Sequence, residues 1–147
     1  MTIIGFNFLK IDAQRLQGAG QAKINVSNNV SIKEVHSAEI NLTGSASAGL
    51  RYVFTYTAVY EPSVGKITLE GEVLTMDDKK VCDDILSGWK EKKALPQQQS
   101  QSILNTILSK STVQALILSR ELNLPAPIPI PKVKQEVKQE AASEKKA

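Results

Sequence analysis

A strict alternation of residue type runs through positions 50–73 and is the strongest pattern in the sequence. One side of an extended chain would carry large residues from position 50 to 60, and the same alternation returns after a loop at 61–65. The residues on that side are Leu50, Tyr52, Phe54, Tyr56 and Tyr60 in the first run and Ile67, Leu69, Gly71 and Val73 in the second. The pattern predicts an antiparallel hairpin with two usable faces.

Two further strands are expected upstream of this hairpin. Apolar residues recur at even positions between Ala22 and Ile32, which predicts a long strand. Phe6 and Phe8 alternate with their neighbours over a shorter stretch. Glycine-containing segments at 18–20 and 44–49 separate these runs. The first half of the chain is therefore predicted to form strands.

Helical spacing replaces the alternation after position 77. Val81, Ile85 and Trp89 stand four residues apart, behind two aspartates and ahead of three lysines, which predicts a short helix. Pro96 and the segment 97–102 are expected to interrupt the pattern, and a longer helix follows from Ile103 to Leu122. Its apolar residues extend beyond one face, which predicts an oligomer. The expected interface residues are Ile107, Val113, Leu116 and Ile117.

The C-terminal part of the chain changes character twice. Proline occupies every second position from 125 to 131, which favours an extended, polyproline-like segment. Residues 132–147 contain a repeated Val-Lys-Gln-Glu and few apolar residues, so they are predicted to be a solvated tail. We therefore expect one domain over residues 1–131 and a charged, disordered tail over 132–147.

Charge and cysteine content narrow the classes of function. The net charge is +3, but without residues 132–147 the chain holds 13 basic and 12 acidic residues. Such a balance argues against a nucleic-acid-binding surface. The single cysteine, Cys82, fits a reducing compartment. The N-terminus does not resemble a signal peptide, and the most apolar window is far shorter than a membrane span. A cytoplasmic protein that does not insert into a membrane is expected.

The residues capable of catalysis do not converge on a reaction. His36 has no nucleophile or metal ligand near it in the sequence. Cys82 precedes two aspartates, which raise a thiol pKa and disfavour an activated nucleophile. The aspartate pairs at 77–78 and 83–84 suit the start of a helix and do not match a calcium loop. We expect no enzyme, no metal and no cofactor.

The order of the elements, together with a Leu-Asn-Leu segment and prolines at 122–127, resembles the SecB family of export chaperones and its archaeal relatives. The resemblance implies an α+β fold with a four-stranded antiparallel sheet and helices packed on one face. It also implies a tetramer built as a dimer of dimers and an aromatic groove that holds unfolded chains. The groove would contain Phe6, Phe8, Tyr52, Phe54, Tyr56 and Trp89.

Two interpretations of function follow from this resemblance and from the excess of aromatic residues. In the first, the protein is an ATP-independent chaperone that binds unfolded polypeptides, with a translocation component as a further partner. The mixed charges of Lys66, Glu70 and Glu72 depart from the acidic sheet face of the family, so fold and client binding are carried over before the export partner. In the second, the protein is an oligomeric adaptor. An aromatic strand face closed by partner subunits would favour the adaptor, and an open one would favour client binding.

Overall fold

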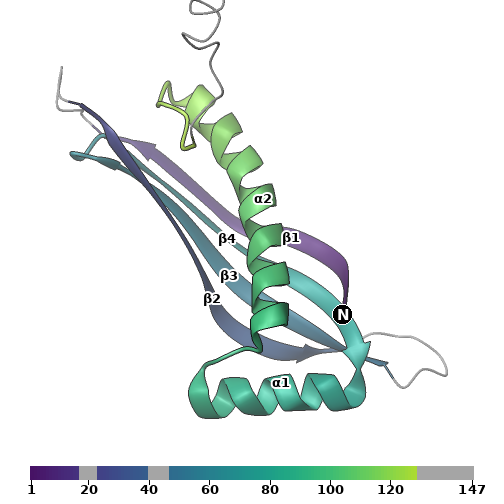
Figure 1. The fold of residues 1–147 in the computed structure, drawn as a ribbon. Coiled ribbons are helices and arrows are strands. Elements are labelled where there is room, and N and C mark those ends of the chain that lie inside the picture. Colours follow the sequence, from purple (N-terminus) through teal and green to yellow (C-terminus); the bar gives the residue numbers. More distant parts are fainter. Residues whose placement is uncertain (17–22, 40–46, 129–147) are drawn as a thin grey trace, which may run out of the picture.

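The computed structural model describes residues 1–16, 23–39 and 47–128. These residues form a four-stranded antiparallel sheet with the strand order β1-β4-β3-β2, followed by two helices. The strands are β1 (Thr2–Arg15), β2 (Asn25–Ala38), β3 (Ser47–Glu61) and β4 (Gly65–Asp78), and the helices are α1 (Lys79–Lys92) and α2 (Gln97–Glu121). Both helices lie on one face of the sheet (Figure 1), which confirms the predicted α+β architecture.

The predicted hairpin is formed by β3 and β4 in the middle of the sheet. Tyr56 pairs with Leu69 and Tyr60 pairs with Gly65, so the core-facing residues of both strands share one side. We call this side the inner face, because the helices cover it. Every even position of β3 from 50 to 60 is buried, whereas the odd positions are half-buried or exposed. The alternation in the sequence therefore identified the buried side of the hairpin correctly.

β1 is longer than the short strand predicted around Phe6 and Phe8. It spans 14 residues and pairs with β4 along its length. A register shift between Phe8 and Lys10 leaves Leu9 unpaired, after which Ile11 pairs with Leu69 and the alternation resumes. A β-bulge breaks the two-residue period of the apolar residues. The alternation around Phe6 and Phe8 therefore predicts a strand shorter than β1.

The helix α1 forms where it was predicted, but α2 begins at Gln97 rather than Ile103. Pro96 stands directly before α2, where a missing N–H costs no helical hydrogen bond, and the Ser100 N–H donates to its carbonyl at 2.9 Å. Glutamine is a good helix former. The glutamine-rich segment therefore extends α2 instead of interrupting it.

Two apolar clusters fill the space between the inner face and the helices. The first lies beneath α1 and the beginning of α2 and includes Tyr52, Phe54 and Ile107. The second includes Tyr56, Tyr60 and Leu124, and it extends to the end of α2. All four β3 aromatic side chains have no exposed surface. The core of this domain is thus continuous with the aromatic face that the sequence singled out.

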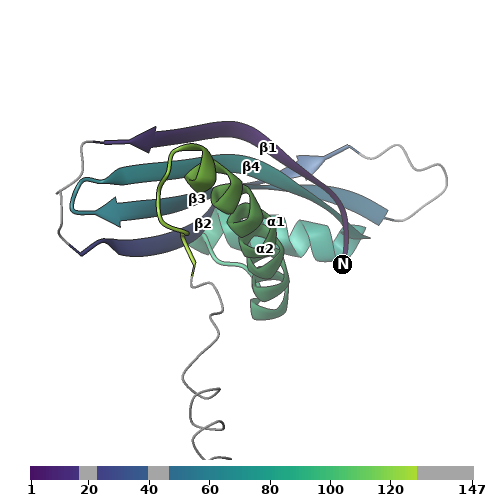
Figure 2. The same ribbon diagram turned by 90° about the horizontal axis from the view of Figure 1, so that it is seen from above.

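The end of α2 turns the chain back over the sheet. Asn123 adopts a left-handed conformation with φ at 53°. The Leu124 N–H donates to the Ser119 carbonyl at 2.8 Å and the Asn123 N–H donates to the Arg120 carbonyl at 3.3 Å, which is the hydrogen-bond pattern of a Schellman motif. Residues 122–128, here called the crossing segment, then pass over the inner face towards β2 (Figure 2). The predicted tail at 132–147 lies outside the described residues.

Candidate functional site

An open groove lies between β2 and the connection from α1 to α2. It consists of two adjoining hollows of about 200 and 530 Å³ that share Leu95, Ser100 and Leu104. The smaller hollow is also lined by Val30, Ser31, Ile32, Trp89 and Lys93, and the larger one by Gln97, Gln101 and Asn105. We call these two hollows together the connection groove.

The end of α1 shapes one wall of this groove. Lys93 follows the helix in a left-handed conformation with φ at 51°, and its N–H donates to the Trp89 carbonyl at 2.9 Å. Its ammonium nitrogen lies 5.3 Å from the centre of the Trp89 ring, within the range of a cation–π contact. The groove therefore combines an indole ring, aliphatic side chains and a positive charge at its rim.

The second wall is the free edge of the sheet. β2 is the last strand in the order β1-β4-β3-β2, and its only neighbour among the described strands is β3. The outer backbone groups of an edge strand can pair with another extended chain. The connection groove and this edge thus lie side by side at Val30–Ile32.

Of the six residues predicted to form a binding groove, Trp89 lines the connection groove. Tyr52, Phe54 and Tyr56 are fully buried beneath the helices. Phe6 and Phe8 are half-buried on β1, at the sheet edge opposite to β2. The rings of Phe6, Phe8 and Phe54 pack together, with centroids 5.0 to 6.3 Å apart. These phenylalanines form part of the core, so the structure does not bring the six residues together in one open site.

The aromatic face of β3 is closed, but not by partner subunits. The chain's own helices and its crossing segment cover it, and Tyr60 donates a hydrogen bond from its hydroxyl to the Pro125 carbonyl at 2.8 Å. Closure of this face therefore does not distinguish an adaptor from a chaperone. The open surface is found one strand further along the sheet, at the connection groove.

The predicted oligomer interface is divided by the fold. Ile107 is fully buried in the core of its own chain, so that part of the prediction is wrong for a surface contact. Val113 and Ile117 have exposed fractions of 58% and 50%, and Leu116 is half-buried. These three positions fall within about 100° around α2 at 3.6 residues per turn. They form a small apolar stripe on the outside of the helix.

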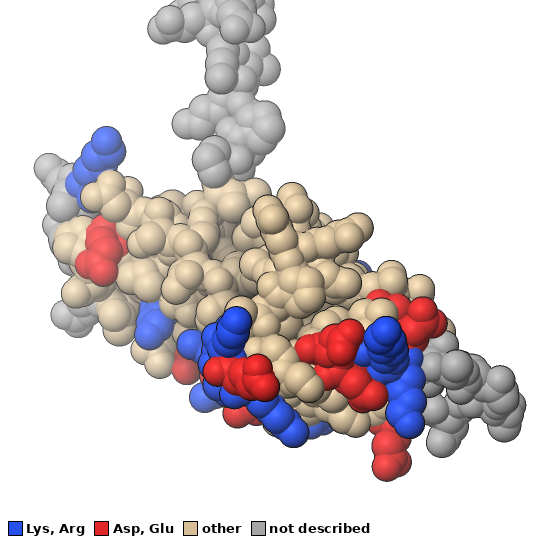
Figure 3. Space-filling model, turned by 60° about the horizontal axis from the view of Figure 1, so that its bottom comes forward, with Lys and Arg blue, Asp and Glu red and all other residues tan. Residues whose placement is uncertain are grey.

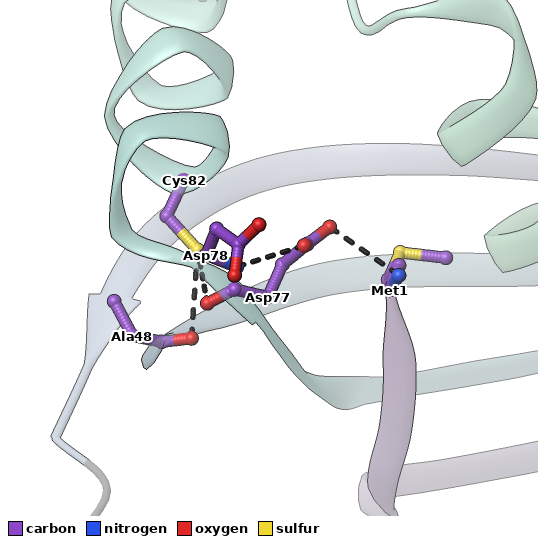
Figure 4. A network of polar contacts seen from close by, with 5 residues as sticks. All are labelled: Met1, Ala48, Asp77, Asp78 and Cys82. Atoms are coloured by element: carbon purple, nitrogen blue, oxygen red, sulfur yellow. Dashed lines mark hydrogen bonds and ion pairs between the residues drawn. The ribbon is translucent and has the colours of Figure 1, made fainter. Parts of the chain in front are cut away.

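Cys82 is held in a structural network at the start of α1. Its thiol lies 3.5 Å from the Ala48 carbonyl oxygen and 3.8 Å from that of Asp77, and Asp77 also pairs with the N-terminal amine of Met1 (Figure 4). Burial raises the pKa of the Cys82 thiol, and the Asp77 carboxylate raises it further. A thiol in this environment stays protonated and is a poor nucleophile.

The remaining polar candidates are spread over the surface. The Nε2 atom of His36 lies 2.7 Å from a Glu34 oxygen on exposed β2. Within residues 1–16, 23–39 and 47–128, no group of three or more His, Cys, Asp or Glu side chains could hold a metal ion. In Figure 3, basic and acidic side chains lie next to one another, mainly along the lower part of the face shown. No helix among the described residues is long and apolar enough to cross a membrane.

Sequence reasoning missed most of the residues that line the connection groove. Leu95 stands in no predicted element, and Ser100 falls in the predicted interruption at 97–102. Leu104 falls in the predicted long helix, and Val30 and Ile32 fall in a predicted strand. No local pattern in the sequence distinguishes these positions from ordinary core positions of a strand or helix.

Comparisons with solved structures find chains of similar shape, among them a SecB-like chaperone. The SecB-like chaperone of Mycobacterium tuberculosis, solved in complex with a peptide from an antitoxin, superimposes with a TM-score of 0.46 at 13% identity, over 90% of this chain and 89% of that one. No family model matches the chain, and no curated protein matches it either. At this identity and TM-score, the likeness neither establishes a family nor assigns a function.

Proposed function

We propose that this protein binds extended, non-native polypeptide segments in the connection groove, without nucleotide, and so acts as a chaperone-like holder. The observation that carries the proposal is the position of an open groove, lined by both apolar and polar side chains, directly beside the sheet edge at Val30–Ile32. An extended chain can add its backbone to such an edge while its side chains enter the neighbouring hollows.

The lining of the groove offers apolar contacts to client side chains beside polar groups such as Gln97, Gln101 and Asn105. Trp89, Leu95 and Leu104 offer aromatic and aliphatic contacts, and Lys93 is the charged residue among those that line it. Apolar contacts and backbone hydrogen bonds require no particular sequence. Binding is therefore expected to be promiscuous and to weaken only modestly when salt screens charges.

The proposal is tested by changing one groove residue and one matched residue outside it. Leu104 lines both hollows, whereas Leu108, one turn further along α2, has an exposed fraction of 44% and lines neither. The Leu104→Asp variant should bind fluorescently labelled, reduced and carboxymethylated α-lactalbumin at least about tenfold more weakly than wild type, because apolar contact is lost and a charge is placed in the groove.

The Leu108→Asp variant should bind the same probe with the affinity of wild type. Fluorescence anisotropy gives the two dissociation constants, and circular dichroism checks that both variants are folded. Equal weakening by both substitutions, or no binding by the wild type, would contradict the proposal. The adaptor interpretation would then be favoured, because it needs no client site.

Self-association through α2 is part of the same proposal. Val113 and Ile117 expose apolar surface on one side of α2, and such a stripe gains free energy when a second copy covers it. The double variant Val113→Glu/Ile117→Glu should have a smaller mass by light scattering than wild type, approaching the 16.0 kDa of one chain. Leu108→Glu, on a different side of α2, is the control and should keep the wild-type mass. A tetramer and a translocation partner remain predictions from the sequence resemblance.

A further inference from the structure

The crossing segment is held by side chains from three strands. Arg15 of β1 donates from Nη1 to the carbonyls of Leu122 and Asn123, at 3.0 and 3.3 Å. On β3, the Tyr60 hydroxyl donates to the Pro125 carbonyl at 2.8 Å, and on β2, Asn28 donates from Nδ2 to the Pro127 carbonyl at 2.7 Å. The donors thus reach the carbonyls at 122, 123, 125 and 127 of a chain that crosses the strands (Figure 2), and the last three of these alternate along the segment.

This arrangement recognises backbone and needs no particular side chain. All three strand residues donate to main-chain oxygens. Proline has no N–H to donate, so a row of donors suits a segment in which proline alternates with other residues. The amide of Asn28 is oriented by Tyr56, whose hydroxyl donates to Asn28 Oδ1 at 2.8 Å. The donor at this position is therefore oriented by a buried side chain, Tyr56.

Apolar contacts also hold the crossing segment. Leu124 has an exposed fraction of 8%, and Pro127 is buried. A Cβ atom at Gly65 would stand 3.1 Å from both terminal carbons of Leu124 and 2.8 Å from the Gln14 carbonyl oxygen. Glycine at this position leaves the space that the leucine side chain fills. The inner face therefore provides hydrogen-bond donors for the backbone of an extended segment and space for an apolar side chain.

The surface beneath the crossing segment adjoins the connection groove along β2. Asn28, which holds Pro127, stands two positions before Val30, which lines the groove. Both residues belong to the inward series of β2. A polypeptide lying in the groove could therefore continue onto the surface over Tyr56 and Tyr60 if the crossing segment were absent from it.

We infer that the surface formed by Arg15, Asn28, Tyr56 and Tyr60 is a second binding site for extended, proline-containing polypeptide, and that the crossing segment occupies it as an intramolecular competitor. The competing role rests on the proposed function of the connection groove. Release of residues 124–128 lengthens the surface available to a client, and return of the segment shortens it. The crossing segment thus regulates how much of a client chain the protein can hold.

The inference is tested in the full-length chain with a free peptide that has the sequence of residues 123–130. Leu124→Ser removes the apolar anchor of the tethered segment but leaves the site intact. We expect the labelled peptide to bind this variant at least about tenfold more tightly than it binds wild type, where the tethered segment competes. Adding Tyr60→Phe to Leu124→Ser should reverse most of that gain, because the donor to the second carbonyl is lost.

Matched controls separate this effect from general damage. Leu9→Ser changes a leucine that is 62% exposed on β1, and Tyr52→Phe removes a buried hydroxyl that bonds no described residue. Neither should alter peptide binding. If Leu124→Ser does not fold, Leu124→Ala should give the same ranking with a smaller gain. Equal binding of the peptide to wild type and to a folded Leu124 variant would overturn the inference.

The client probe distinguishes this inference from the proposed function. Reduced and carboxymethylated α-lactalbumin should bind Leu124→Ser about threefold or more tightly than wild type. Adding Leu104→Asp should weaken client binding at least about tenfold while peptide binding to the Leu124→Ser site persists. Client binding without peptide binding would contradict the second site alone. Peptide binding without any client binding would contradict the proposed holder function and the competing role, but it would support the site itself.

Discussion

The two ends of the inner face are built from the same strands and differ in what covers them. At the end containing Tyr56 and Tyr60, the crossing segment supplies backbone acceptors and a leucine, and the aromatic rings have no exposed surface. At the other end, α1 and α2 leave the connection groove open, and Trp89 lies at its wall. The comparison teaches that aromatic content alone does not locate a binding surface. The packing of the helices and the course of the chain after α2 together decide which aromatic residues are accessible.

The largest expected difference between the two ends is in stability. Tyr60→Ala would leave a closed cavity and an unpaired Pro125 carbonyl, and should lower the free energy of unfolding by about 4 kcal/mol. Trp89→Ala should cost about 2 kcal/mol, because its space opens into the connection groove and water can fill it. Urea unfolding measures both values. A larger loss for Trp89→Ala would show that the groove end is the better packed one.

A glycine between the two ends sets how closely the strands and rings approach. A Cβ atom at Gly71 would lie 2.4 Å from the Asn7 carbonyl oxygen and 2.7 Å from a ring carbon of Phe54. Because both neighbours are held in the sheet and core, Gly71→Ala should lower the free energy of unfolding by about 3 kcal/mol. Gly88→Ala is the control. Its Cβ would meet only the Ala94 carbonyl oxygen, at 3.6 Å, so the substitution should be neutral or stabilising in the helix. Equal stability of the two variants would contradict the close approach.

The sequence predicted the parts of the fold that depend on regular patterns. The alternation at 50–60 and the spacing of Ile85 and Trp89 gave the correct hairpin and first helix, because burial on one side imposes a period on the sequence. The bulge after Phe8 removed that period and hid the second half of β1. Pro96 was read as a break, although proline is equally suited to the position before a helix.

The candidate site was less predictable, because it depends on contacts between distant segments. Tyr60 and Pro125 are 65 positions apart, and Asn28 and Pro127 are 99 apart. No local sequence pattern predicts that the proline-rich segment returns to the sheet. The aromatic residues were recognised as an unusual feature, but the closure of Tyr60 by the chain itself follows only from the turn at Leu122–Leu124. That turn depends on the left-handed conformation of a single residue, Asn123.

Alkaline pH is expected to have a smaller effect on the free energy of unfolding. This effect reports whether water is excluded equally from both ends of the inner face. Burial raises the pKa of Tyr60 to about 12, with Tyr56 contributing less, and burial likewise raises the pKa of Tyr52 to about 12. Because the unfolded tyrosines ionise near pH 10, their contribution to stability is complete below pH 10 and is lost between pH 10 and 12. Urea unfolding from pH 8 to 12 should show this loss.

Substitution of either tyrosine by phenylalanine should make that dependence shallower. If the two ends are equally dry, Tyr60→Phe and Tyr52→Phe should reduce the slope by similar amounts. In Leu124→Ser the ring of Tyr60 becomes accessible, so the ultraviolet titration of its phenol should move from about 12 towards 10. An unchanged titration would mean that α2 alone keeps the closed end dry, without help from the crossing segment.

The smallest expected effect concerns Lys93 at the rim of the open end, where two contributions oppose each other. The ammonium group over Trp89 stabilises the fold by about 0.5 kcal/mol at an exposed site, whereas the left-handed backbone of Lys93 costs a similar amount or more in any residue with a Cβ. Lys93→Ala loses the cation–π contact and keeps the strain, so it should be less stable than wild type by about 0.5 kcal/mol. Lys93→Gly loses the same contact but relieves the strain, so it should be more stable than Lys93→Ala by about 1 kcal/mol. Equal stability of the two variants in urea unfolding would mean that the turn after α1 relaxes, and that the wall of the connection groove is not fixed by its backbone.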